Sequence, residues 1–201
     1  MTAWFEAHRE TLEKALETAA SRDYWTAYPE MPSGRIYGET AKDDGAAAFK
    51  ACLGNTFEID GHPSNGGAAG KESSPFGLPL NISYPTADVE QLMAAAKDAG
   101  KAWGRTSIEM RTGVCLELLD RLNKRSFEIA NAVMHTTGQA FMMAFQAGGP
   151  HAQDRGLEAV TYAFEEMTRT PAKATWTKPQ TKALNRRGQT RYGAWEEQET
   201  S

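Results

Sequence analysis

Long apolar runs and cysteine are both scarce in this 201-residue sequence. No stretch approaches the roughly 18 consecutive apolar residues of a membrane-spanning helix. The N-terminus carries acidic side chains where a signal peptide would be apolar. The two cysteines, Cys52 and Cys115, form no CxxC motif, which suits a reducing compartment and indicates neither a zinc site nor a redox site. We therefore expect a cytoplasmic protein that does not bind membranes.

The charge is unevenly distributed along the chain. The sequence has 26 acidic and 22 basic residues, a net charge of −4. Residues 171–193 carry basic side chains and no acidic ones, so the preceding body is more acidic than the net charge suggests. An acidic body is a poor surface for nucleic acid, and we expect no nucleic-acid partner. The apolar fraction of 40% is typical of a soluble globular protein.

Motifs that bind phosphate, dinucleotides or metals are missing. The segment 66–71 (GGAAGK) is the nearest match to a phosphate loop, but Asn65 stands where that loop begins with glycine and Glu72 where it ends with a hydroxyl residue. This favours a flexible surface loop. No GxGxxG turn follows a predicted strand, and the four histidines have no metal-ligand spacing.

Cys115 is the natural candidate for a nucleophile. It lies on the apolar face of a predicted helix, where a cysteine is more often part of the core. A dyad with His135 would require the fold to bring the two together. The methionines 134, 142, 143 and 167 are more typical of core packing than of a ligand groove. The residues themselves thus predict a scaffold, with no catalytic, cofactor-binding or metal-binding residue.

Apolar periodicity predicts a mostly α-helical chain, an antiparallel helical layer with two or three short strands. A stretch rich in aromatics, proline and glycine (24–39) is expected to be a structured loop with its rings on a core. Alternating patterns predict strands over 56–60 and 78–84, the latter at a sheet edge because of Pro79. Helices are predicted over 3–20, 40–53, 86–103, 106–122, 126–138, 139–147 and 150–167.

Two helix starts carry the spacing of a capping box, Thr40-x-x-Asp43 and Thr106-x-x-Glu109. Past Pro179 the periodicity is lost, and we expect disorder over 180–201. The predicted buried faces of the 106–122 and 150–167 helices are Met110, Val114, Cys115, Leu118, Leu119 and Leu122, and Ala152, Ala159, Val160, Ala163, Phe164 and Met167.

Residues 85–170 resemble the N-terminal helical region of the aldehyde dehydrogenase superfamily, with an Ala-rich helix ending in Trp103, an Arg-led Leu-rich helix, and a helix closing in a Thr-Gly turn. Three segments narrow the resemblance to the PaaN family of phenylacetic acid degradation proteins. They are 24–49, 73–88 and 136–160, the last reading TTGQAFMMAFQAGGPHAQDRGLEAV.

This resemblance implies an α/β parent fold and NAD- or NADP-dependent oxidation of an aldehyde or a CoA-linked semialdehyde through a covalent thioester, in a protein that forms homo-oligomers. The family's nucleophilic cysteine and coenzyme-binding turn lie beyond the region that this sequence matches. We therefore expect the 201-residue chain to be inactive and to bind no coenzyme.

The resemblance also divides the chain into an N-terminal extension (1–77), the helical region (78–179) and a non-native tail (180–201), such as a frameshift or a truncated gene would give. We expect an exposed apolar face where the rest of the family's fold would dock. The alternative is a non-catalytic helical protein-interaction module, whose basic segment 173–191 contacts an acidic partner or an anionic membrane surface.

Overall fold

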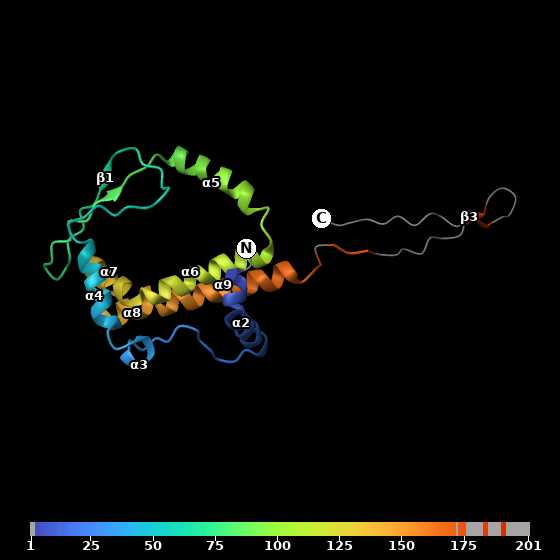
Figure 1. Cartoon of the computed structure of the whole chain (residues 1–201), viewed down its shortest axis with the longest axis horizontal. Coiled ribbons are helices and arrows are strands. Elements are labelled where there is room, and N and C mark those ends of the chain that lie inside the picture. Colours follow the sequence, from blue (N-terminus) through green and yellow to red (C-terminus); the bar gives the residue numbers. More distant parts are fainter. Residues whose placement is uncertain (1–2, 172, 176–182, 185–189, 192–201) are drawn as a thin grey trace. The chain divides into compact units, whose positions relative to one another are not determined.

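The computed structural model describes residues 3–171, 173–175, 183–184 and 190–191, and these are mostly α-helical, as predicted (Figure 1). Contacts divide the chain into two units, Met1–Phe164 and Glu165–Ser201. The helices are α1 (Ala3–Ala7), α2 (Arg9–Ser21), α3 (Gly34–Tyr37), α4 (Ala41–Cys52), α5 (Val89–Trp103), α6 (Ile108–Lys124), α7 (Ser126–Thr137), α8 (Phe141–Gly148) and α9 (Pro150–Thr168).

The strands are shorter than the alternating patterns predicted. β1 (Ala68–Ala69) pairs antiparallel with β2 (Tyr84–Pro85). The predicted strand over 56–60 is reduced to one bridge between Thr56 and Ser83, and the one over 78–84 is interrupted. Its backbone leaves the extended region at Asn81, which has a φ of 49°. A left-handed residue cannot continue a ladder, so the isolated bridge between Ser73 and Pro79 that precedes it does not extend into β2.

Of the predicted disordered tail, the structure describes β3 (Ala183–Leu184) and β4 (Thr190–Arg191), which pair antiparallel. The remaining residues of 180–201 lie outside the described part of the chain. The predicted boundaries at 77 and 179 stay predictions.

The predicted helix over 3–20 is in fact two helices, α1 and α2, separated at His8. His8 has φ −112° and ψ 11°, outside the α region. Its side chain reaches across to Glu117 on α6, with 2.8 Å between Nε2 and Oε2. The break coincides with this tertiary contact, which the periodicity of the sequence does not encode.

The first core joins α1 and α2 to α6 and α9. α1 comes so close to α6 that a Cβ at Gly113 would lie 2.6 Å from the Phe5 nitrogen. The aromatic loop contributes as predicted, because Tyr28 is buried and Trp25 packs beside it. Tyr24 of the same loop instead remains 87% exposed. The buried residues of this core are Phe5, Leu12, Ala15, Tyr28, Leu116, Leu119 and Leu157.

The second core joins α3, α4, α7 and α8 around the rings of Tyr37, Phe127, Phe141 and Phe145. The centroids of Phe127 and Phe145 lie 4.9 Å apart, and Tyr37 meets both rings edge-on. Ala130 and Phe145 are completely buried. This cluster packs α8 against α7, and the two helices are neighbours in Figure 1.

The buried faces of α6 and α9 differ from those predicted. On α6, Leu118 is 56% exposed and Leu122 37% exposed, while Thr112 and Gly113 are buried beside Leu116 and Leu119. On α9 the predicted alanines 152, 159 and 163 are exposed, and the buried residues are Pro150, Gln153, Leu157 and Thr161.

Buried polar groups explain this shift. The Gln153 amide accepts a hydrogen bond from Asn123 Nδ2 (2.8 Å) and donates one to Ser126 Oγ (3.1 Å). The Thr161 hydroxyl donates to the Leu157 carbonyl. A polar side chain whose hydrogen bonds are satisfied can be buried at modest cost, so α9 turns this side toward α6.

Neither predicted capping box forms. Thr40 makes no side-chain cap to α4. The Thr106 hydroxyl donates to the Trp103 carbonyl, and the adjacent Ser107 caps α6 by accepting from Met110 N (3.2 Å). The helices nevertheless begin within two residues of the predicted positions.

Candidate functional site

The structure separates the residues that the sequence suggested as a dyad. Cys115 lies half-buried on α6. His135, on α7, hydrogen-bonds through Nδ1 to Ser74 Oγ (2.9 Å) and stacks on Phe49 with ring centroids 5.1 Å apart. His135 thus fastens the 73–79 loop to α4 and α7. The other cysteine, Cys52, is half-buried on α4, and its thiol donates to the Ala48 carbonyl.

The glycine-rich segment at 66–71 is part of a strand pairing. The predicted surface position is confirmed, because the segment is exposed, but Ala68 and Ala69 form the two-residue strand β1, which the prediction of a loop did not include. Gly70 has a φ of +147°, and a Cβ at that position would collide with the Ile82 carbonyl oxygen. Glycine is needed here for the close approach of two backbones.

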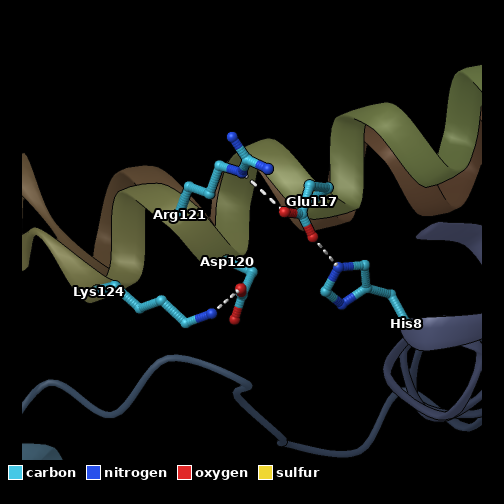
Figure 2. A network of polar contacts seen from close by, with 5 residues as sticks. All are labelled: His8, Glu117, Asp120, Arg121 and Lys124. Carbon is cyan, nitrogen blue, oxygen red and sulfur yellow. Dashed lines mark hydrogen bonds and ion pairs between the residues drawn. The ribbon is translucent and has the colours of Figure 1, made fainter.

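Sequence reasoning missed one polar network, which is drawn in Figure 2. His8 meets Glu117, whose second oxygen accepts a hydrogen bond from Arg121 Nε (2.7 Å). One turn further along α6, Lys124 Nζ donates to Asp120 Oδ2 (2.6 Å). Within the described residues, ligand atoms of His8, Glu117 and Asp120 lie within 4.8 Å of one another, close enough to consider a metal ion.

The charges of the network argue against a metal site. Hydrogen bonds from His8 and then Arg121 lower the pKa of Glu117, and the hydrogen bond to Asp120 raises the pKa of Lys124. Each carboxylate therefore already has a cation beside it, and a metal ion would have to displace both. The network joins the α1–α2 break to α6 and carries no chemistry of its own. In the sequence, the signal for this network was the i,i+4 spacing of the two ion pairs on α6.

A cavity of about 710 Å³ lies between α2, the loop that follows it, and α9. The loop is held to α9 by Thr26 Oγ1, which donates to Asp154 Oδ2 (2.7 Å), and by a 2.8 Å contact between Glu30 and His151. Burial raises the pKa of Asp154. The lining mixes Trp25 with acidic and basic side chains and selects no ligand class.

An exposed apolar surface lies on α5. Not one of its 15 residues is buried. Val89 is 72% exposed, Met93 54% and Trp103 43%. Figure 1 shows α5 as a separate helix, joined to β2 at one end and to α6 at the other. A helix of this length is only marginally stable in water without packing.

Comparison with known proteins shows what this fold is similar to. No family model matches the sequence. Acetaldehyde dehydrogenase of Pseudomonas aeruginosa is 28% identical over 123 residues, which is 59% of this chain and 24% of that protein. The crystal structure of an NAD-dependent aldehyde dehydrogenase from Burkholderia multivorans matches 90% of this chain at 54% identity, with a TM-score of 0.86.

These matches support the aldehyde dehydrogenase superfamily for this chain. They agree with the resemblance seen in the sequence and identify the fold as a fragment of an aldehyde dehydrogenase fold. The chain spans about a third of the solved relative, 32%, and about a quarter of the curated one, 24%. The narrower resemblance to PaaN stays a prediction.

None of the described helices is both long enough and apolar enough to cross a membrane. Among the described residues, neither cysteine has a basic side chain as a hydrogen-bond partner.

Proposed function

We propose that this chain is the N-terminal scaffold of a PaaN-type, NAD- or NADP-dependent aldehyde dehydrogenase of phenylacetate catabolism. The observation that supports this is the 54% identity and TM-score of 0.86, over 90% of the chain, to a structure named as an NAD-dependent aldehyde dehydrogenase. Identity at this level over so much of the chain favours a shared role for the shared part.

The chain supplies helical framework and leaves the chemistry to the remainder of the polypeptide. Cys52 and Cys115 are half-buried on helices, and the glycine-rich segment is committed to pairing β1 with β2. In this proposal the nucleophile and the coenzyme site belong to the remaining two-thirds, and the 201-residue chain alone binds no NAD(P) and oxidises no aldehyde.

The assignments to the PaaN type and to phenylacetate catabolism rest on the sequence segments 24–49, 73–88 and 136–160. They favour a substrate that is an aldehyde or a CoA-linked semialdehyde derived from an opened aromatic ring. They also favour a cytoplasmic homo-oligomer as the complete enzyme.

A chimera tests the dehydrogenase assignment. The third of the Burkholderia multivorans enzyme that matches this chain is replaced by residues 1–179 of this sequence. We expect the chimera to bind NAD in calorimetry and to form NADH when an aldehyde is added. A folded chimera that binds NAD but oxidises no aldehyde at all would overturn the assignment, and NAD binding by the isolated 201-residue chain would overturn its role as a scaffold.

The phenylacetate assignment has a separate test in the host. Deleting the gene should abolish growth on phenylacetate as sole carbon source and leave growth on succinate unchanged, with restoration by the intact gene. Unimpaired growth of the deletion strain on phenylacetate would refute this assignment without touching the superfamily.

A further inference from the structure

The apolar side chains of α5 form a continuous stripe. Val89, Met93, Ala96 and Trp103 recur at intervals of four, three and seven residues, which places them on one face of a helix. The opposite side is polar, with an ion pair between Lys101 and Asp98 (2.9 Å). The helix is therefore amphipathic, with a polar side that suits solvent and an apolar side that suits a partner.

The described part of the chain provides no partner for this stripe. The α5 side chains other than that of Leu92 are all exposed, and Leu92 is only half-buried. The local ties of α5 are at its ends, where Asn65 donates to Asp88 (3.3 Å) and Thr106 bonds the Trp103 carbonyl. Both ties fix where the helix begins and ends, and neither covers its apolar side.

The comparison indicates what does cover it. The same fold, at 54% identity, occurs in a chain of which this one spans only 32%. The other two-thirds of such a polypeptide is thus the part of a dehydrogenase missing from these contacts. A membrane is a poorer candidate, because the polar side of α5 alternates acidic and basic residues, whereas a helix that binds anionic lipid presents a basic side.

We propose that Val89, Met93 and Trp103 of α5 form the surface on which the remaining two-thirds of an aldehyde dehydrogenase polypeptide docks. This inference rests on the proposed function and adds the contact that holds scaffold and catalytic part together. The exposed stripe is then an interface that is empty in the isolated chain and filled in the complete enzyme.

The test places the same new charge on either side of α5. Met93→Asp puts a carboxylate in the stripe, and Gln91→Asp puts one on the polar side, both at exposed positions of the same helix. Each substitution is made in the chimera and in the isolated 201-residue chain. In the chimera we expect Met93→Asp to lower the melting temperature by roughly 3 °C or more, because it leaves a charge in an apolar interface.

Gln91→Asp should leave the chimera unchanged, and neither variant should alter the melting temperature of the isolated chain. An equal melting temperature for the Met93→Asp and parent chimeras would overturn the docking surface, even if both oxidise aldehyde. A drop in melting temperature confined to Met93→Asp in a chimera without activity would support docking while refuting the proposed function.

Two further experiments complete the test. The first distinguishes docking of the rest of a dehydrogenase from docking of a second copy of this chain, and the second applies if the parent chimera does not fold. If the isolated chain is a dimer that Met93→Asp converts to a monomer, the stripe binds a second copy and the proposal is overturned. If the parent chimera does not fold, the remaining two-thirds of the relative is co-expressed with this chain as a separate polypeptide. Co-purification that Met93→Asp abolishes and Gln91→Asp preserves supports the proposal, and co-purification insensitive to both overturns it.

Discussion

Gly45 lies where α4 packs tightly on α7 and offers a sharp test of the second core. A Cβ added there would lie 2.8 Å from the Glu128 nitrogen and 2.8 Å from the Phe127 carbonyl carbon, and closer still to the Phe127 Cβ. Carbon atoms in contact prefer roughly 3.5–4.0 Å. Because backbone atoms cannot turn aside as a side chain can, Gly45→Ala must push α4 away from α7.

The expected loss of unfolding free energy follows from two opposing effects. Overpacking a well-filled core costs about 1–3 kcal/mol, and replacing glycine by alanine inside a helix returns about 1 kcal/mol. With two backbone contacts this short, the upper part of the range applies, and the free energy of unfolding should fall by about 1–2 kcal/mol. For a chain of this size that lowers the melting temperature by about 2–8 °C.

Gly100→Ala is the matched control. Gly100 is also inside a helix, α5, but a Cβ there would meet no atom within 4 Å. The same chemical change should therefore stabilise α5, by up to about 1 kcal/mol. The two variants are compared with the parent by thermal unfolding followed by circular dichroism. If Gly45→Ala is as stable as the parent, the close packing of α4 on α7 is wrong.

Three further variants test the core and the charged contacts. Phe145→Ala removes a ring that is completely buried and should cost about 3–5 kcal/mol in urea unfolding; a loss below about 1 kcal/mol would mean that the aromatic cluster is not packed as described. Glu117→Gln removes a carboxylate whose pKa is lowered by His8, so the parent's stability from this contact is present above pH 4.5 and lost as the pH falls below it. The variant should lack that part of the acid dependence in melting curves, and parallel curves for both proteins would refute the contact. Asp154→Asn keeps an oxygen for the hydroxyl of Thr26 but removes a charge that burial disfavours, since burial raises the pKa of Asp154 above 3.8. It should melt at or above the parent temperature at neutral pH, with the difference vanishing in acid as Asp154 itself becomes protonated, and a lower melting temperature at neutral pH would contradict this.

The positions of the helices were predictable because their signals are local. Glycine at 138 takes a left-handed φ of 78° and ends α7 where predicted, with its N–H bonded to the Met134 carbonyl. The break between α1 and α2 was not predictable, because the apolar spacing continues through His8. Its contact with Glu117 joins residues 109 positions apart, and no local pattern encodes such a pair.

The buried faces were harder to predict than the helices. Leucines at 118 and 122 were expected inside because they are apolar, yet both are exposed. Gln153 was not among the predicted buried residues, yet it is 2% exposed, with its amide satisfied by two side chains from other helices. Burial depends on whether a partner is present, and partners at long sequence distance decide it.

Single residues indicated little about a site for the same physical reason. Cysteine, histidine and glycine motifs were the local signals available, and the structure uses His135 and Gly70 for packing and strand pairing. The contacts that matter for the fold, such as Thr26 with Asp154, join segments 128 residues apart. Only the long segments that resemble a known family carried information about function.

α5 shows the opposite case, an apolar side in the sequence for which the described residues provide no partner. Its sequence has a clear apolar side, and the helix forms where the pattern predicts, but no α5 residue is buried in the described part of the chain. A stripe of this kind costs solubility if left in water. The exposed leucines 118 and 122 on α6 add to the same excess of uncovered apolar surface. A chain that spans 32% of its solved relative is expected to show such an excess at the surfaces where the other part packs. The exposed apolar side of α5 is therefore what the proposed docking surface predicts for this chain by itself.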